Sequence, residues 1–373
     1  MSNEIEIGRG KRGRRAYSFD DIAVVPSRRT RDPKDVSVGW QIDAYHFDLP
    51  IVAAPMDSVM TPDSAVALGR FGGLGVLDLE GLWTRYESPE PLLAEIAELP
   101  ADEATHRMQA IYSEPIKPEL ITQRLKEIRS AGVTVAGALT PQRTQEFYKT
   151  VVDAGVDLFV IRGTTVSAEH VSGNAEPLNL KRFIYELDVP VVVGGASTYT
   201  AALHLMRTGA AGVIVGYGST EGATTTGEVL GIGLPMATAI ADAAAARRDY
   251  LDETGGRYVH VIADGDITSS GDLAKAIACG ADAAVLGAPL AVAAEAPGGG
   301  WYWPSAAAHP SVPRGTMLPV SFGDRPSLDR VLTGPSDDPF GSLNFVGGLR
   351  RSMAKSGYSD LKEFQKVGLT VRA

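Results

Sequence analysis

Two stretches of the chain, PVVVGGASTYTAALHLMRTGAAGVIVGYG (190–218) and VIADGDITSSGDLAKAIACGADAAVLGAP (261–289), match each other along their whole length. The match aligns three pairs of glycines: Gly194 with Gly265, Gly209 with Gly280, and Gly216 with Gly287. Each stretch contains an apolar run, a glycine, a helical segment that begins at Ser or Thr, a second glycine and another apolar run. This order predicts a strand–helix–strand unit that occurs twice.

Further apolar runs extend the pattern to eight predicted strands, near residues 51, 74, 133, 157, 190, 212, 260 and 283. These runs lack polar alternation, which is typical of buried parallel strands. Eight alternating units predict an α/β fold, a single-domain (β/α)8 TIM barrel, and a doubly wound parallel sheet is the alternative. The wide gaps between strands 2 and 3 and between strands 6 and 7 are predicted to hold extra helices.

The composition is that of a soluble globular protein, because 44% of the 373 residues are hydrophobic and 21% are charged. No apolar run reaches the ~18 residues of a membrane span, so no membrane association is expected. The net charge of −10 argues against a nucleic-acid binder. A single cysteine excludes a disulfide framework, and no metal site is predicted. Residues 1–15 form a basic arm that we expect to be a solvated tail, and the expected compartment is the cytoplasm.

In such a barrel, the chemistry lies in the loops that follow the carboxyl ends of the strands. The loop after the sixth strand, GYGSTEGATTTGEVLGIG (216–233), is rich in glycine and threonine. The hydroxyls of Thr224 and Thr226 could position a water or transfer a proton, and Glu228 could orient them. The alternative is a glycine turn whose threonines cap the next helix. The glycine spacing differs by one residue from the dinucleotide fingerprint, so it is weak evidence for a Rossmann fold.

Several segments together resemble the inosine monophosphate dehydrogenase/GMP reductase family: APMDSV (54–59), GGLGV (72–76), VGYGST…TTTGEVLGIGLPMATAI (215–240), VIADGDI (261–267), AAVLGAPLAVAAEAPG (283–298) and LNFVGGLRRSMAKSGYSDLKEF (343–364). The resemblance covers residues 16–373, and it is strongest to a short actinobacterial paralogue. It implies a barrel that forms a homotetramer or octamer, binds a purine mononucleotide (IMP, GMP or XMP) and uses NAD or NADP.

The resemblance also implies a set of site residues. The substrate-binding positions are Met56, Asp264, Gly265, Asp266, Gly287, Ala288, Gly315 and Met317, with Asp264 on the ribose hydroxyls. The cofactor-binding positions are Arg162, Gly194, Gly216 and Gly218. The catalytic positions are Thr224, Thr226 and Glu228.

The chain departs from the family pattern at the nucleophile. The family attacks the purine with a cysteine of the loop after strand 6, where this chain has Ala223 or Thr224. The only cysteine, Cys279, lies before the eighth strand and is predicted to be a small core residue at the opposite mouth. The paired regulatory CBS domains between strands 2 and 3 are absent, because residues 80–132 are too few for them.

The positions around the nucleotide differ as well. Arg162 replaces an aspartate that contacts the cofactor, and Ala196 replaces an asparagine. Asp266 replaces a glycine of the phosphate turn, where an inward carboxylate would repel phosphate, and Ala288 replaces a serine. The catalytic Arg–Tyr flap pair has no clear counterpart.

Two classes of function follow from these features. The first is an oxidoreductase of purine mononucleotides whose thioimidate chemistry is impaired or absent, with GMP reductase as a variant. The second is a non-catalytic nucleotide-binding paralogue that regulates or co-assembles with full-length IMP dehydrogenase.

Overall fold

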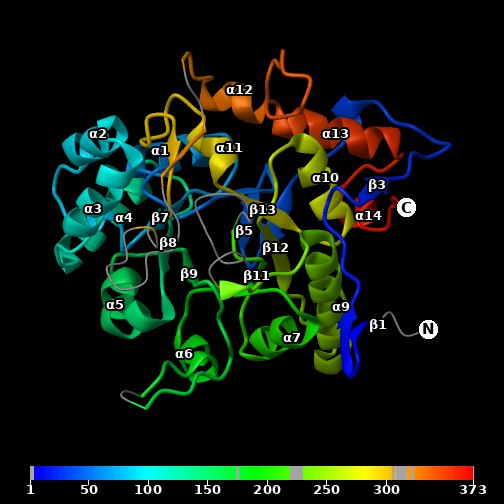
Figure 1. The fold of residues 1–373 in the computed structure, drawn as a ribbon, viewed down its shortest axis with the longest axis horizontal. Helices are drawn as coiled ribbons and strands as arrows, with labels where there is room; N and C mark the ends of the chain where they lie inside the picture. The colour runs from blue at the N-terminus through cyan, green and yellow to red at the C-terminus, as the bar shows by residue number, and fades with distance from the viewer. Residues whose placement is uncertain are drawn as a thin grey trace.

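The computed structural model describes residues 4–173, 176–218, 230–304, 307, 317–320 and 323–372. Eight parallel strands form its central sheet (Figure 1): β6 (Ile51–Ala53), β7 (Val76–Asp78), β8 (Ala136–Leu139), β9 (Leu158–Arg162), β10 (Val191–Ala196), β11 (Gly212–Val215), β12 (His260–Asp264) and β13 (Ala283–Leu286). The sheet order is β6-β13-β12-β11-β10-β9-β8-β7, and a parallel bridge between Val52 and Leu74 joins its two edges. The predicted (β/α)8 barrel is therefore confirmed, and the doubly wound alternative is excluded.

Helices on the outside connect the strands: α1 (Pro62–Arg70), α5 (Pro141–Asp153), α6 (Leu180–Glu186), α7 (Tyr199–Arg207) and α10 (Ser270–Ala278). Each begins at a side chain that accepts a hydrogen bond from the first helical turn. In the two matching units, Thr198 accepts from the backbone N–H of Ala201, and Ser269 accepts from that of Asp272. These caps satisfy N–H groups that lack a partner within the helix, which explains why the Ser/Thr positions predicted the helix starts.

The extra helices lie in the two gaps where the sequence predicts them. Between β7 and β8 the chain forms α2 (Glu90–Glu98), α3 (Ala101–Ile111) and α4 (Pro118–Ser130), after a short 3-10 helix η2 (Leu82–Thr84). Between β11 and β12, the described residues contain the long helix α9 (Met236–Thr254). None of the described helices is both long and apolar enough to cross a membrane.

A hairpin closes the N-terminal mouth of the barrel, where the strands begin. It consists of β4 (Trp40–Ile42) and β5 (Tyr45–Phe47), and it buries Ile42 completely. The Ile42 side chain reaches the start of β11, because its Cδ1 would lie 3.2 Å from a Cβ placed on Gly212. The interior of the barrel is therefore closed at this mouth by a packed side chain, as is usual for the structural end of a barrel.

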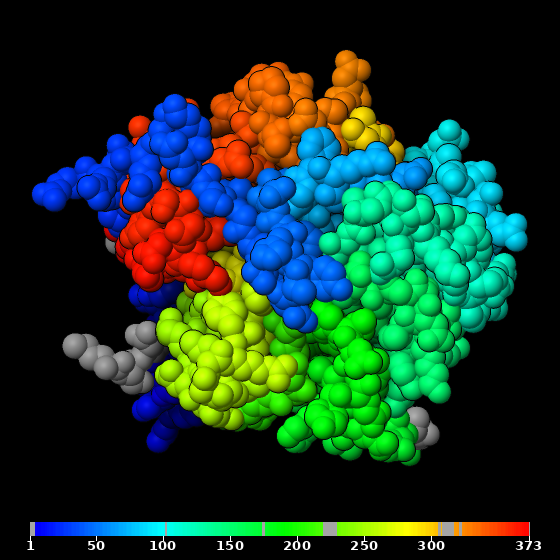
Figure 2. Space-filling model, turned by 180° about the vertical axis from the view of Figure 1, so that it is seen from behind, coloured from blue at the N-terminus to red at the C-terminus, as the bar shows by residue number. Residues whose placement is uncertain are grey.

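The rest of the chain packs around the barrel: β3 (Ile22–Val24), η1 (Pro33–Asp35), α11 (Ala288–Ala291), β14 (Trp301–Tyr302), β15 (Leu318–Pro319), α12 (Leu328–Leu332), α13 (Phe345–Lys355), α14 (Leu361–Phe364) and β16 (Leu369–Val371). Strand β16 pairs with β3, so the C-terminal segment lies beside an N-terminal one. Figure 2 shows this from behind, with the red C-terminal residues against the blue N-terminal part of the chain.

The basic arm is not the solvated tail that the sequence suggests. Strands β1 (Glu4–Gly8) and β2 (Lys11–Arg14) form an antiparallel hairpin beside α9 (Figure 1). The guanidinium of Arg14 donates to both carboxylate oxygens of Asp242 on α9, at 2.6 and 3.0 Å. A bidentate pair of this kind fixes the position of the arm, although its strands remain exposed.

Candidate functional site at the C-terminal mouth of the barrel

Six of the residues predicted to bind substrate or cofactor line one cavity at the carboxyl ends of the strands: Gly218, Asp264, Gly265, Asp266, Gly287 and Ala288. The cavity has a volume of about 30 Å³. This is close to the share of one water molecule in the liquid, roughly 30 Å³. Pockets for small molecules typically measure about 300–1,000 Å³. The cavity that these described residues line is thus much smaller than a mononucleotide site.

An ion pair between Arg162 and Asp264 spans the mouth. Arg162 ends β9 and Asp264 ends β12, and the guanidinium donates to one carboxylate oxygen through Nε at 2.9 Å and Nη2 at 2.7 Å. The side chains are 20% and 6% exposed. Burial alone would lower the pKa of Arg162, but the Asp264 carboxylate outweighs burial and raises this pKa above its ordinary value. The carboxylate predicted to hold the ribose is thus already occupied by a cation.

Tyr302 covers the glycine turn predicted to hold phosphate. Its side chain is buried, and its hydroxyl oxygen would lie 2.7 Å from a Cβ placed on Gly287. Burial raises the pKa of Tyr302 to about 12, so the hydroxyl is neutral. Tyr302 is not among the site residues predicted from the sequence. Its aromatic run GGGWYW (298–303) follows the eighth strand, and this position could have indicated a site residue.

Two glycines of the mouth are required by the packing of neighbouring strand ends. Gly216 has a φ of 108°, and a Cβ there would lie 2.2 Å from the carbonyl oxygen of Asp264. Gly265 has a φ of 148°, and its Cβ would lie 2.4 Å from the carbonyl oxygen of Gly218. Side chains at both positions are excluded by sterics and by backbone conformation. Their predicted contacts with ligands stay predictions.

Asp266 adopts a left-handed backbone conformation, which is uncommon for a residue other than glycine. Its φ is 55°, and it lines the cavity next to Gly265. The turn predicted to hold phosphate thus carries a carboxylate at a backbone conformation that suits glycine. A negative charge in this place opposes the binding of a phosphate.

Replacing Asp266 with glycine is expected to tighten the binding of a purine mononucleotide by about tenfold at low ionic strength, and by less at high ionic strength. Isothermal titration at two salt concentrations measures this difference. Asp43 has a similar φ of 52° in the hairpin that closes the other mouth. Asp43→Gly is therefore the matched control, and it should leave the affinity unchanged. Equal affinities for Asp266→Gly and the wild type would contradict the prediction.

A second carboxylate, Asp57, lies wholly buried behind the same mouth. Its Oδ2 accepts from the Tyr112 hydroxyl at 2.6 Å and from the backbone N–H of Leu82 at 2.8 Å, while Oδ1 has no partner. The indole N–H of Trp303 donates to the Tyr112 hydroxyl at 3.2 Å. Burial raises the pKa of Asp57 from 3.8 to about 6, because the buried carboxylate lacks full compensation.

We expect Asp57 to make the protein less stable as the pH rises from 4 to 7. Because the folded pKa of about 6 exceeds the ordinary value of 3.8, the folded state binds the proton more tightly. The contribution of Asp57 to the free energy of unfolding is fully present at pH values below the ordinary pKa. This contribution falls by on the order of 3 kcal/mol as the pH rises through the pKa of the folded state. Urea unfolding of Asp57→Asn should show a flatter pH profile. The exposed control Asp63→Asn should keep the wild-type profile.

The remaining predicted residues are distributed differently. Met56 and Met317 are buried but do not line the cavity, and Gly194 lies within β10. Four predicted residues lie outside the described part of the chain: Thr224, Thr226, Glu228 and Gly315.

The only cysteine lies at the other end of the barrel. Cys279 follows α10 as its C-cap, immediately before β13, and is partly buried against the core. Burial raises the pKa of its thiol to about 12, so the nucleophilic thiolate does not form at neutral pH. The prediction of a small core residue at the opposite mouth agrees with this placement.

The described residues on the predicted cofactor side do not fit a nicotinamide. The guanidinium of Arg162 is bound to Asp264, and Ala196 offers only a methyl group that is 1% exposed. Near them, the hydroxyls of Ser197 and Tyr217 hydrogen-bond to each other at 2.6 Å. Within the described part of the chain, no hydride-transfer step follows from this arrangement.

Comparisons with known proteins agree on one family. Residues 16–308 match the model of the IMP dehydrogenase / GMP reductase domain. The chain is 63% identical to an uncharacterized oxidoreductase of Mycolicibacterium smegmatis, over 98% of this chain and 99% of that protein. It is 25% identical to the inosine-5'-monophosphate dehydrogenase of Methanocaldococcus jannaschii, over 95% of this chain and 92% of that protein.

A solved structure is also similar along nearly the whole chain. The crystal structure of an IMP dehydrogenase/GMP reductase-like protein from Corynebacterium glutamicum superposes with a TM-score of 0.94 at 52% identity, covering 99% of this chain and 98% of that one. The likeness thus extends beyond the barrel to the segments that surround it.

Proposed function

Since this chain belongs to the IMP dehydrogenase/GMP reductase family of oxidoreductases, we propose that it binds a purine mononucleotide at the C-terminal mouth without carrying out the cysteine-dependent reaction. In this proposal, residues 16–373 form one barrel domain that follows the arm 1–15. As the family resemblance implies, the protein would act in the cytoplasm as a homotetramer or octamer, or together with full-length IMP dehydrogenase.

The observation that carries this proposal is the position of the chain's only thiol. Formation of a covalent bond to the purine needs a thiolate at the mouth, and Cys279 lies at the opposite end with a pKa near 12. A threonine hydroxyl in the loop after β11 is too weakly acidic to replace it without a strong base. Binding of the ligand and turnover of the ligand are therefore separable in this protein.

The retained part of the site is the carboxylate of Asp264. It is buried at the end of β12, where the family anchors the ribose, and it holds Arg162 in the absence of a ligand. A ribose diol would compete with Arg162 for this carboxylate, to which Arg162 donates at Oδ2 only, and a phosphate at the glycine turn would displace Tyr302 from Gly287. Binding would therefore be weaker than in a preformed pocket, because part of the binding free energy is spent on these movements.

Calorimetric titration with IMP, GMP and XMP, together with absorbance of the reduced nicotinamide, tests the proposal. We expect at least one nucleotide to bind, Asp264→Ala to weaken it more than tenfold, and no change in absorbance with NAD, NADP or their reduced forms. Turnover of IMP with NAD or NADP would instead establish an oxidoreductase, and turnover of GMP with a reduced cofactor would establish a GMP reductase. Failure of all three nucleotides to bind would reject the proposal.

A further inference from the structure

A second cavity lies at the N-terminal mouth of the barrel, opposite the Asp264 site. Its volume is about 270 Å³. Four distant parts of the chain build it: strand β4 of the hairpin, the start of β12, the residue before β13, and helix α14. We call it the basal pocket. Because it depends on none of the residues at the C-terminal mouth, a ligand here would be independent of the nucleotide.

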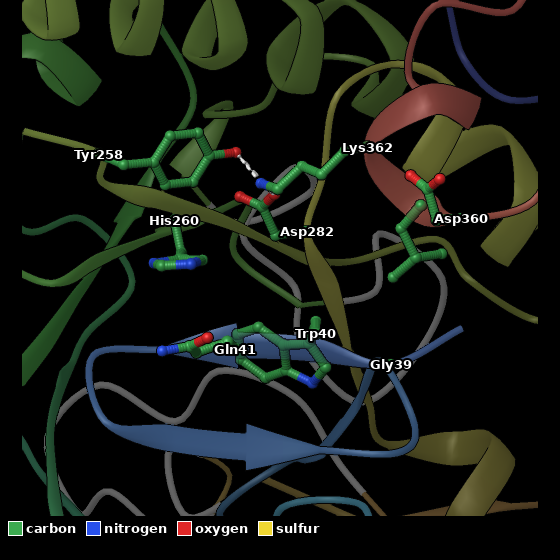
Figure 3. A pocket seen from close by; sticks show the side chains of 9 residues that line it. Gly39, Trp40, Gln41, Tyr258, His260, Asp282, Asp360 and Lys362 are labelled. Carbon is green, nitrogen blue, oxygen red and sulfur yellow. Dashed lines mark hydrogen bonds and ion pairs between the residues drawn. The ribbon is translucent and has the colours of Figure 1, made fainter. Parts of the chain in front are cut away.

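The two sides of the basal pocket differ in chemistry. In Figure 3, Tyr258, Asp282 and Lys362 lie on one side, and Trp40 and Gln41 of the hairpin lie on the other. The first side is charged, whereas the indole makes the second side largely flat and apolar. A ligand that touches both sides therefore needs a charged group and a flat apolar part.

The aromatic walls are held in place by contacts with one another and with residues outside the pocket. The Trp40 ring stacks on Phe47 with centroids 5.2 Å apart, and its indole N–H donates to the carbonyl oxygen of Leu49 at 3.0 Å. The imidazole of His260 meets the ring of Trp40 at 6.0 Å and that of Tyr258 at 4.9 Å, both edge to face. Such fixed rings form a preorganised surface, which reduces the entropy lost on binding.

The charged side is balanced in charge. Asp282 is fully buried, and its carboxylate faces two cations: Arg247 at 2.8 Å and the ammonium of Lys362. It also accepts from the Tyr258 hydroxyl at 2.8 Å and from the Gln365 amide at 3.1 Å. The two positive charges of Arg247 and Lys362 are matched by the two negative charges of Asp282 and Asp360.

One of these charged groups, the ammonium of Lys362, is accessible from the pocket. The Lys362 side chain is 55% exposed, and its ammonium lies 3.8 Å from the centroid of the Tyr258 ring. Asp360 is the other acidic residue of the lining, and its carboxylate accepts the backbone N–H of Glu363 at 2.9 Å as the cap of α14. The accessible cation of the basal pocket is therefore Lys362.

We propose that the basal pocket binds a small planar monoanion, a single-ring aromatic carboxylate. Its carboxylate would pair with Lys362, and its ring would lie against Trp40 and His260. The volume equals that of about nine water molecules at roughly 30 Å³ each, which suits one ring with one substituent.

Benzoate is the probe, and benzamide is its uncharged counterpart of nearly equal shape. Ligand-observed NMR with the full chain should detect benzoate binding in the millimolar range or tighter, with benzamide at least tenfold weaker. Lys362→Gln should reduce benzoate affinity at least tenfold. Lys366 is an exposed lysine of the same segment, paired with Glu363 at 2.7 Å, so Lys366→Gln should keep the wild-type affinity.

Lys362→Arg keeps the charge and separates a loss of binding from a loss of folding. We expect this variant to retain benzoate binding within about threefold, whereas Lys362→Gln should not. Three results would overturn the proposal: no benzoate binding to the wild type, equal affinities for benzoate and benzamide, or unchanged benzoate affinity in Lys362→Gln. The addition of IMP should leave benzoate affinity unchanged, which keeps this test distinct from that of the nucleotide site.

Discussion

Replacing Arg162 with methionine is expected to lower the free energy of unfolding by about 3 kcal/mol and to tighten mononucleotide binding at least tenfold. The two effects have one origin. Without the guanidinium, the 6%-exposed carboxylate of Asp264 remains buried and unpaired, which destabilises the protein without ligand. The same carboxylate is then free to accept the ribose hydroxyls. Urea unfolding and calorimetric titration of the same preparation measure both changes.

A double-mutant cycle isolates the contribution of this pair. We expect Arg162→Met combined with Asp264→Ala to cost less than the sum of the two single changes, by at least about 1.5 kcal/mol. The surface pair Arg182–Glu186, 77% and 57% exposed, provides the control, and Arg182→Met should leave the free energy of unfolding close to that of the wild type. Weaker nucleotide binding in Arg162→Met would show that the arginine contacts the ligand directly.

Replacing Asp282 with asparagine is expected to cost about 3–5 kcal/mol at neutral pH, because Arg247 loses its buried counter-charge. Burial raises the pKa of Asp282, but Arg247 and Lys362 outweigh burial and lower it below the ordinary value. Because its pKa is lowered by folding, Asp282 stabilises the protein at pH values above the ordinary pKa. This stabilisation is lost as the pH falls through the pKa of the folded state. The difference between wild type and variant in urea unfolding should therefore shrink in acid.

The control for this prediction is a carboxylate–arginine pair on the surface. Asp337 pairs with Arg330, and the two side chains are 79% and 38% exposed. Asp337→Asn should leave the free energy of unfolding close to that of the wild type. If Asp282→Asn were equally mild, the buried cluster would not stabilise the N-terminal mouth.

The strands and most of the helices could be predicted because their signals are local. Apolar runs, glycines after helices, and residues such as Thr198 and Ser269 at helix starts each depend on a few neighbours in sequence. The extra helices follow from the same patterns. The placement of the basic arm could not be predicted from local signals, since it depends on Asp242, far away in the chain.

The functional mouth was less predictable, because its decisive contacts join distant residues. The sequence places Arg162 and Asp264 at separate strand ends, with Arg162 on the cofactor and Asp264 on the ribose, but nothing local indicates that they bind each other across 102 residues. The position of Tyr302 over Gly287 depends on the antiparallel pairing of β14 with β15. The raised pKa of Asp57 likewise results from tertiary burial.

The pairing of β16 with β3 affects how the molecule is made on the ribosome. All eight barrel strands are synthesised before residues 361–371, and this segment supplies the strand that pairs with β3 and two of the donors to Asp282, Lys362 and Gln365. During translation, the nascent barrel would therefore expose an unpaired strand edge and a carboxylate without its full set of donors. Such surfaces attract chaperones and wrong partners. Completion of the N-terminal mouth is thus a late step of folding.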